Sequence, residues 1–257
     1  MEGINAISTP AATSRLRVAQ FIVVLFHVTG FLGLALSDDP GFYLRFTPLT
    51  LLLTVGLLVA FQPGRNVPFW LFCLTVGLLG FLAEFVGVNT ALLFGNYRYG
   101  DTLGWQYGGV PPLIGLNWVM LTYLGGMLAR YLPGPALGRL LAGALLMLAL
   151  DVCMEPVAGR FDFWYWTADI IPLRNFRDWF ILACLLQYLF QRADFEKRNP
   201  LVPLVYLVQL LFFFGLGSLP TTGGRPINSA HAHPATHPPA KRPPRGGQAG
   251  VVLPHVR

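Results

Sequence analysis

Charged residues are scarce in this chain. Only 12% of its 257 residues are Asp, Glu, Lys or Arg, whereas 54% are hydrophobic. An ordinary soluble domain is about 25% charged, so the composition excludes a protein that is soluble on its own. The formal net charge is nevertheless +6, with the basic residues in loops and tails, where they usually set orientation and contact lipid. No basic stripe with interleaved aromatic residues occurs, so we expect no nucleic-acid partner.

Metal and redox motifs are missing as well. The three cysteines, Cys73, Cys153 and Cys184, stand singly inside apolar segments. They lack the spacing of a zinc site or a redox pair, and we interpret them as small packing residues. No repeated His and Glu spacing suggests another metal, and the glycines of residues 99–109 lack the strand–turn–helix context of a phosphate loop. We therefore expect no metal and no cofactor.

The chain is instead rich in long apolar runs. Each run has roughly 20 residues, the length that crosses the hydrocarbon core of a bilayer as a helix. We predict an all-α fold, a polytopic transmembrane helical bundle of about seven spans. The spans are expected at residues 17–36, 43–61, 68–87, 112–131, 137–156, 176–191 and 201–219.

This pattern divides the chain into three regions. Residues 1–16 form a polar N-terminal segment, residues 17–219 the transmembrane catalytic bundle, and residues 220–257 a tail rich in His, Pro and basic residues. Such a tail cannot bury enough apolar surface to offset its ordering entropy, so we expect it to be disordered. Arg15 and Arg17 precede a full-length span, and we expect no cleavable signal peptide.

Two connections between the spans, residues 88–111 and 157–175, are long and aromatic. Both are too aromatic for ordinary solvent loops, so we expect them to fold back over one mouth of the bundle. Their rings can form an interfacial belt, or a wall that stabilises a cation in a substrate by about 0.5–2 kcal/mol per ring. The rings are Trp105 and Tyr107 in the first connection and Trp164, Tyr165 and Trp166 in the second.

Polar residues near the ends of the apolar runs fall on one side of the membrane. Odd-numbered spans end, and even-numbered spans begin, on the same side, and both long connections join these ends. Carboxyl groups at membrane depth cost several kcal/mol unless they are used or paired, which makes them functional-site candidates. The polar residues that share this side are Glu84, Asn89, Asn117, Asp151, Glu155, Asn175 and Asp178.

Asp151 and Glu155 are the strongest candidates for acid–base chemistry. They are four residues apart and share a helix face. Two close carboxylates in a low-dielectric site do not both ionise readily, so the pair is expected to keep a proton, which a general acid requires. Glu84, flanked by apolar residues, is a further candidate acid. The alternative is that each carboxyl ties helices together through an arginine or an amide. Pro156 is expected to end the helix at Glu155.

The amides allow two interpretations. Asn89, Asn117 and Asn175 can position water or a substrate hydroxyl. Asn175 can instead be the N-cap of the sixth span, with Asp178 at the third position of a capping box. His27 is a lone histidine among apolar neighbours in the first span, which is more typical of a packing residue than of a ligand.

Four ordered stretches carry a family resemblance. They are F-L-A-E-F-V-G-V-N-T-A-L-L-F-G-N-Y-R-Y (81–99), G-V-P-P-L-I-G-L-N-W (109–118), L-D-V-C-M-E-P-V-A (150–158) and F-W-Y-W…I-P-L-R-N-F-R-D-W-F (163–180). They resemble the membrane-bound carotenoid 1,2-hydratases. That family includes bacterial γ-carotene 1′-hydroxylase-type enzymes and the haloarchaeal bisanhydrobacterioruberin hydratase. The His- and Pro-rich tail does not match its pattern.

The resemblance implies addition of water across the terminal C1–C2 double bond of an acyclic carotenoid end, giving a tertiary alcohol without a redox cofactor. It implies a carotenoid substrate such as lycopene or a γ-carotene-like compound, and a multi-pass protein in the cytoplasmic membrane of a prokaryote. The lipid bilayer and other carotenoid-pathway enzymes are then its expected partners.

The residues themselves suggest a mechanism for such a reaction. We expect one of the three buried carboxyls to protonate C2, and another to position water with Asn117 or Asn175. Trp164 and Trp166 are expected to face the developing cation at C1 in dry surroundings that strengthen these electrostatic effects. Two other functions stay open: an end-group cyclase, which also begins by protonation, and a transporter in which clustered acids relay protons.

Overall fold

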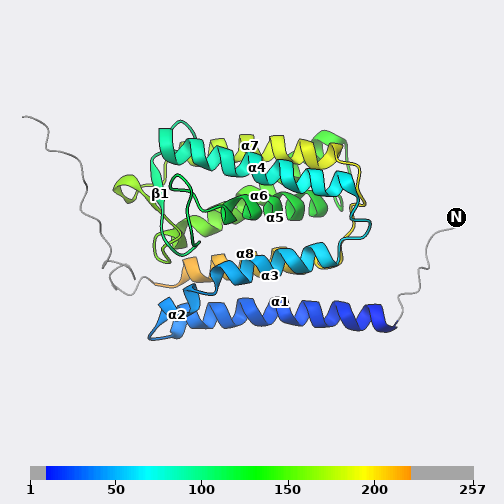
Figure 1. Ribbon diagram of the computed structural model, residues 1–257, viewed down its shortest axis with the longest axis horizontal. Helices are drawn as coiled ribbons and strands as arrows, with labels where there is room; N and C mark the ends of the chain where they lie inside the picture. The colour runs from blue at the N-terminus through cyan, green and yellow to red at the C-terminus, as the bar shows by residue number, and fades with distance from the viewer. Residues whose placement is uncertain (1–9, 221–257) are drawn as a thin grey trace, which may run out of the picture. The chain divides into compact units, whose positions relative to one another are not determined.

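Helices dominate the part of the chain that the computed structural model describes, residues 10–220 (Figure 1). The elements are α1 (Pro10–Leu36), α2 (Pro40–Leu44), α3 (Thr47–Ala60), α4 (Val67–Thr90), β1 (Tyr97–Tyr99), α5 (Leu113–Ala129), α6 (Ala136–Ala158), β2 (Trp164–Trp166), the 3₁₀ turn η1 (Thr167–Asp169), α7 (Leu173–Arg192) and α8 (Val202–Ser218). The expected disordered tail lies outside the described residues from residue 221 onward.

Each of the seven predicted spans coincides with helix, and the all-α membrane bundle is confirmed. Four stretches are long and apolar enough to cross a membrane, while α5 and α8 are apolar but shorter. The four stretches are Thr13–Leu36, Pro40–Ala60, Val67–Thr90 and Ala136–Ala158. The second of them is broken into α2 and α3 by Arg45 and Phe46. The side chain of Asp39 caps α2 by accepting a hydrogen bond from the N–H of Phe42 at 3.1 Å.

The centre of the bundle is α5, which is buried along most of its length and packs on α4, α6, α7 and α8. Glycines set its distance from α4. A Cβ on Gly115 would lie 2.7 Å from the carbonyl oxygen of Gly77, and a Cβ on Gly80 would lie 2.4 Å from the ring of Trp118. Small residues of this kind let membrane helices approach closely. The close approach places Trp118 against α4.

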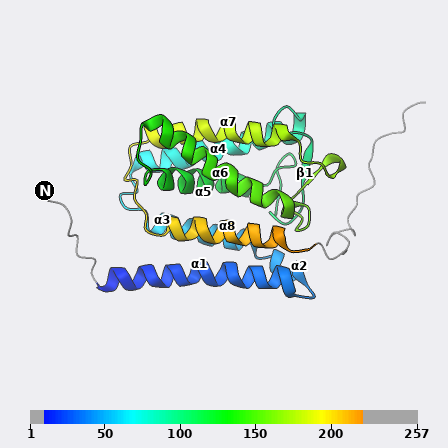
Figure 2. The ribbon, with the colours of Figure 1, turned by 180° about the vertical axis from the view of Figure 1, so that it is seen from behind.

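An outer layer is formed by α1. It lies beyond α3 and α8, on the opposite side of the bundle from α4 and α7 (Figures 1 and 2). It packs on α2 and α8 but leaves large apolar side chains exposed, among them Phe21, Leu25 and Leu32. An apolar face of this extent marks an interaction surface on a soluble protein. On a membrane bundle it is the surface that lipid solvates.

The two long connections pair as a small antiparallel sheet at one end of the bundle. β1 and β2 align Tyr97 with Trp166, Arg98 with Tyr165, and Tyr99 with Trp164. The strands are not among the elements that the sequence predicts, but the pairing brings the two connections together as expected. We refer to residues 91–112 and 159–172 as the lid.

Pro156 does not end α6 at Glu155, so that prediction is wrong. The helix continues to Ala158 with Pro156 inside it. A proline removes its own N–H from the helix ladder and crowds the carbonyl four residues before it, but Pro156 lies in the last turn, where only two helical residues follow it. The carbonyls of Val157 and Ala158 accept hydrogen bonds from the N–H groups of Phe161 and Phe163, at 3.1 and 2.9 Å. These bonds carry the chain directly from α6 into the lid.

Candidate active site

Glu84, on α4, is surrounded by hydrogen-bond donors. Its side chain is buried, and its Oε2 accepts hydrogen bonds from the hydroxyls of Tyr97 at 2.5 Å and Tyr99 at 2.8 Å. Its Oε1 accepts a third from the indole Nε1 of Trp118 on α5, at 3.0 Å. Hydrogen bonds to a carboxylate are charge-assisted and roughly twice as strong as neutral ones. Glu84 therefore ties α4, α5 and the lid together at one point.

Asp151 and Glu155 lie on one face of α6, as the sequence predicts, and share a donor from α7. The side-chain amide of Asn175 donates to Glu155 Oε1 at 2.8 Å and reaches Asp151 Oδ2 at 3.5 Å. Glu155 Oε2 also accepts from the indoles of Trp166 at 2.7 Å and Trp164 at 3.3 Å. Asp151 Oδ1 is buried and has no hydrogen-bond partner among the described residues. The pair thus has one carboxyl oxygen free to carry a proton.

The lid supplies these donors because strand residues alternate in direction. Tyr97 and Tyr99 point inward from β1, and their partners Trp166 and Trp164 point toward Glu155 from β2. Burial and the adjacent Glu84 carboxyl raise the pKa of both tyrosines well above that of free tyrosine. Their hydroxyls therefore stay protonated and act as donors.

The middle residues of the two strands point outward. The guanidinium of Arg98 lies 4.5 Å from the ring centroid of Tyr165, and the Tyr165 hydroxyl donates to Asp162 at 2.7 Å. Asp162 also accepts from the backbone N–H of Asp101 at 2.9 Å. Tyr165 therefore takes part in the contacts that join the two halves of the lid.

A small cavity lies between the two glutamates. Its volume is about 20 Å³, which is room for about one water molecule. We call it the acid cavity, and its polar lining is Glu84, Tyr97, Tyr99, Asn117, Glu155 and Asn175. Its aromatic walls include Phe94, Trp164, Trp166 and Trp179. The arrangement places two carboxyls, two amides and several ring faces around a single site for water.

Several predicted site residues lie away from this cavity. Trp105 and Tyr107 are 73% and 60% exposed and border an apolar groove between α3, α4 and α5. Asn89 is exposed, and its amide donates to the carbonyls of Phe85 at 2.9 Å and Gly108 at 3.0 Å. Asn89 bonds to Gly108, and Tyr107 stacks on Phe85, so these two residues join the first long connection to α4. The structure brings none of the three residues to the acids.

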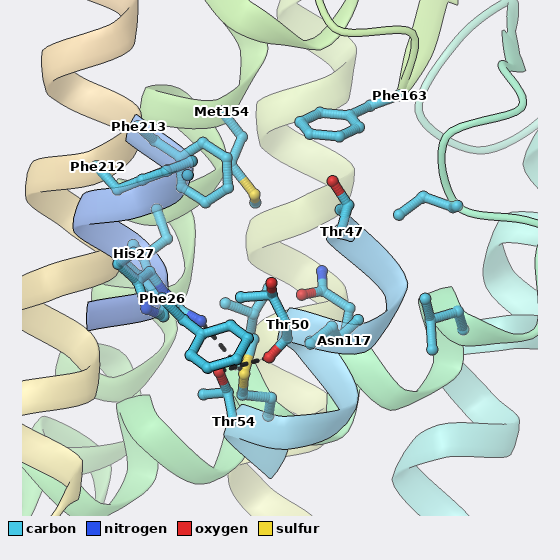
Figure 3. A pocket seen from close by; sticks show the side chains of 18 of the residues that line it. Phe26, His27, Thr47, Thr50, Thr54, Asn117, Met154, Phe163, Phe212 and Phe213 are labelled. Carbon is cyan, nitrogen blue, oxygen red and sulfur yellow. Dashed lines mark hydrogen bonds between the residues drawn. The ribbon is translucent and has the colours of Figure 1, made fainter. Parts of the chain in front are cut away.

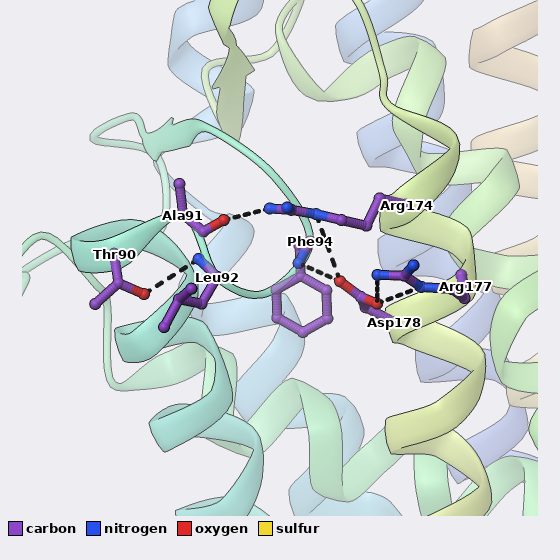
Figure 4. A network of polar contacts seen from close by, with 7 residues as sticks. All are labelled: Thr90, Ala91, Leu92, Phe94, Arg174, Arg177 and Asp178. Carbon is purple, nitrogen blue, oxygen red and sulfur yellow. Dashed lines mark hydrogen bonds and ion pairs between the residues drawn. The ribbon is translucent and has the colours of Figure 1, made fainter.

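Asp178 holds the start of the lid (Figure 4). Its Oδ2 accepts from the backbone N–H of Phe94 at 2.9 Å, and its Oδ1 pairs with the Arg177 guanidinium at 2.8 Å. Arg174 donates to the carbonyl of Ala91 and approaches Asp178 at 3.8 Å. The side chain of Phe94 then packs between Tyr97 and Trp118. Asp178 supports the cavity wall from outside.

The capping interpretation of Asn175 and Asp178 is wrong. α7 begins at Leu173, its N-cap is Pro172, and no side chain caps it. Asn175 therefore sits inside the first turn, where its side chain points toward α6 and not back along its own backbone. Asp178 lies one turn further on, beyond the reach of a capping box. The side chain of Asn175 instead bonds to the acids of α6, and that of Asp178 bonds to the lid.

When the chain is compared with known protein families, residues 46–231 match the family described as carotenoid biosynthesis protein. The chain belongs to this family. It therefore has a role in carotenoid biosynthesis, and the family resemblance that the sequence suggests is confirmed at this level. The hydratase activity itself stays a prediction. No curated protein and no solved structure matches the chain.

In this carotenoid biosynthesis protein, every residue of the acid cavity lies inside the matched segment, whereas α1 and α2 precede it. Within the described residues, no group of three or more His, Cys, Asp and Glu side chains is placed to hold a metal ion. The carboxyls, hydroxyls and amides that line the acid cavity can transfer protons and position water.

Sequence reasoning misses several residues of the site, among them Tyr97, Tyr99, Trp118 and Trp179. The first two had a usable signal, because Y-R-Y (97–99) and W-Y-W (164–166) both place aromatic residues two apart, which is the period of a strand face. The two tryptophans stack with ring centroids 3.9 Å apart and an interplanar angle of 23°. They belong to α5 and α7, and no spacing in the sequence relates them.

Proposed function

We propose that this protein is a carotenoid hydratase. It adds water across the terminal C1–C2 double bond of an acyclic carotenoid end group and yields a tertiary alcohol. The observation that carries the proposal is a water-sized cavity walled by aromatic rings, with Glu84 on one helix and Glu155 on another, in a member of a carotenoid biosynthesis family. Lycopene or a γ-carotene-like compound is the proposed substrate, and the reaction needs no redox cofactor.

The first step is protonation of the alkene. The Asp151–Glu155 pair supplies the proton, because its two carboxyls share the Asn175 amide and Asp151 keeps an oxygen free of other partners. The alkene π pair forms the new C2–H bond, and C1 becomes a tertiary cation. The faces of Trp164, Trp166 and the neighbouring rings stabilise that cation by about 0.5–2 kcal/mol each.

The second step is capture of the cation by water. Glu84 and Asn117 hold the water, whose oxygen lone pair forms the C1–O bond, and Glu84 accepts the proton that the water loses. Between turnovers this proton returns to Glu155 through the water that refills the cavity. The atoms balance: one water is added, and no electron leaves the substrate.

A cyclase would begin with the same protonation, but it has no use for a water site between two carboxyls. The water-sized cavity therefore favours hydration. We further propose that the helices make a multi-pass protein of the cytoplasmic membrane of a prokaryote, where it works beside other carotenoid-pathway enzymes.

The test is expression in a lycopene-accumulating host followed by mass analysis of the pigments. The wild-type protein should add the mass of one water for each reacted end. Glu155→Gln, Asp151→Asn and Glu84→Gln should each lower conversion at least about 100-fold at equal protein level, as expected when acid–base catalysis is lost. Glu196→Gln is the matched control, since Glu196 pairs with Arg198 far from the cavity. Normal hydration by all three site variants, or an isomer of unchanged mass as the product, would refute the proposal.

A further inference from the structure

A second and larger cavity adjoins the acid cavity. Its volume is about 140 Å³, and it is lined by residues of α1, α2, α3, α5, α6, α8 and the lid. Figure 3 shows side chains from these elements converging on it, with Phe212 and Phe213 on one side and Thr47, Thr50 and Asn117 on another. We call this cavity the end-group chamber.

The two cavities share part of their walls. Ile114, Asn117, Met154 and Trp164 line both. Trp164 is the more weakly held of the two indoles on Glu155, at 3.3 Å against 2.7 Å for Trp166. Of the two indoles, Trp164 therefore needs less free energy to move out of the wall between the two cavities. The shared residues thus form the wall between the chamber and the acid cavity.

The lining of the chamber suits an uncharged, apolar ligand. It contains no Asp, Glu, Lys or Arg. Several of its polar side chains already have partners within the protein: Thr54 donates to the Thr50 carbonyl at 2.7 Å, and the ring Nδ1 of His27 bonds to the Val23 carbonyl at 2.8 Å. Branched and aromatic side chains make up most of the remaining wall.

The acid cavity cannot hold an isoprenoid unit by itself, because about 20 Å³ is room for little more than one water. A substrate whose terminal double bond reaches Glu155 must therefore place the carbons behind that bond in an adjoining space. The chamber adjoins the acid cavity across shared wall residues, and its lining carries no charge. These two properties are what a methyl-branched hydrocarbon chain requires.

We infer that the end-group chamber binds the acyclic isoprenoid end of the substrate and presents its terminal double bond to the acid cavity past Trp164 and Asn117. This inference rests on the proposed function. Phe26, His27, Gly30 and Leu34 of α1 form one wall of the chamber, and α1 lies before the segment that matches the family. This wall sets the shape of the end group that the chain accepts.

Gly30 gives the sharpest test. A Cβ added there would meet only the ring of Phe212, at 3.6 Å, so Gly30→Leu fills the chamber without a backbone clash. Gly56→Leu is the matched control, because a Cβ on Gly56 has nothing within 4 Å. Thr50→Phe fills the chamber from α3 and serves as a second variant if Gly30→Leu does not fold.

The assay is photo-crosslinking on the full-length protein in nanodiscs. The probe is an all-trans tetraisoprenoid hydrocarbon with a diazirine next to its terminal double bond, and labelled peptides are mapped by mass spectrometry. We expect labels on the lining residues of α1, α3 and α8, displaced by lycopene. Gly30→Leu and Thr50→Phe should lower this labelling about tenfold, the size expected when overpacking opposes binding, whereas Gly56→Leu should not.

Three results would overturn the inference: labels confined to the outer surface, labelling that is unchanged in both filled variants, or equal labelling of the same residues by a phospholipid with a diazirine in its acyl chain. The last result would make the chamber a general lipid site. Crosslinking does not depend on turnover. Specific labelling without a hydrated product would therefore refute the hydratase activity and still support the chamber as a binding site. A hydrated product, with labelling and turnover unchanged in both filled variants, would support the hydratase activity and refute the chamber as the binding site.

Discussion

At the scale of single residues, the three candidate catalytic acids, Glu84, Asp151 and Glu155, differ in how their oxygens are occupied. Glu84 and Glu155 each accept three hydrogen bonds, from the lid and from neighbouring helices. Asp151 receives one long contact and keeps a buried oxygen without a partner among the described residues. An unpaired buried carboxylate costs several kcal/mol, so Asp151 is the position at which a neutral, protonated carboxyl costs least.

The two tyrosines on Glu84 provide a prediction at this scale. Tyr97→Phe and Tyr99→Phe each remove one donor to a buried carboxyl and keep the ring. Each should lower the free energy of unfolding by about 1–3 kcal/mol, with a loss of hydration as Glu84 reorients. Thermal unfolding in detergent measures the first effect and pigment conversion the second. Tyr188→Phe, on the exposed face of α7, is the control; site variants no less stable than this control would contradict the role of the hydroxyls.

The acids and Asn175 could be predicted from the sequence because helix periodicity and the parity of the spans place them on one side. The tyrosines could not, since their role depends on the register of β1 against β2. Whether Asn175 caps α7 or reaches across to α6 depends on which residue begins the helix. A difference of two or three residues in that start reverses the answer.

At the scale of elements, glycines position the site. Gly77 and Gly80 on α4 face Gly115 and Trp118 on α5, and this contact aligns the Trp118 indole with Glu84. The approximate ends of the helices could be predicted from apolar runs and Pro-Gly turns. The break between α2 and α3 and the continuation of α6 past Pro156 could not, because both depend on where freed backbone groups find partners.

Gly115→Ala is the prediction at this scale. Its new Cβ would lie 2.7 Å from the Gly77 carbonyl oxygen, which is backbone, so α4 and α5 must separate. Overpacking of this kind costs typically about 1–3 kcal/mol, and activity should fall further because Trp118 moves away from Glu84. Gly56→Ala, in open space on α3, should be neutral or slightly stabilising. Chemical denaturation of both variants in the same detergent compares them, and equal stability would show that the α4–α5 contact can relax freely.

At the scale of the whole molecule, the chain topology brings the site residues together at one end of the bundle. Successive helices alternate in direction, so the ends of α4 and α6 and the starts of α5 and α7 meet under one lid, while their opposite ends carry the exposed Arg65 and Arg198. The acid cavity is lined by lid residues at this end of the bundle and shares a wall with the end-group chamber. In the proposed function, water enters from the lid side of the membrane.

This arrangement predicts which loops share a membrane side. In a background where Cys73, Cys153 and Cys184 are replaced by alanine, single cysteines at the exposed positions Asp38 and Asp101 should react with a membrane-impermeant maleimide from the same side. A cysteine at the exposed position Arg65 should react only from the other side. Labelling of intact cells and of inverted vesicles distinguishes the two. If Asp101→Cys and Arg65→Cys react from the same side, α4 does not cross the membrane, and the lid cannot cover the acids from the surface that supplies their water.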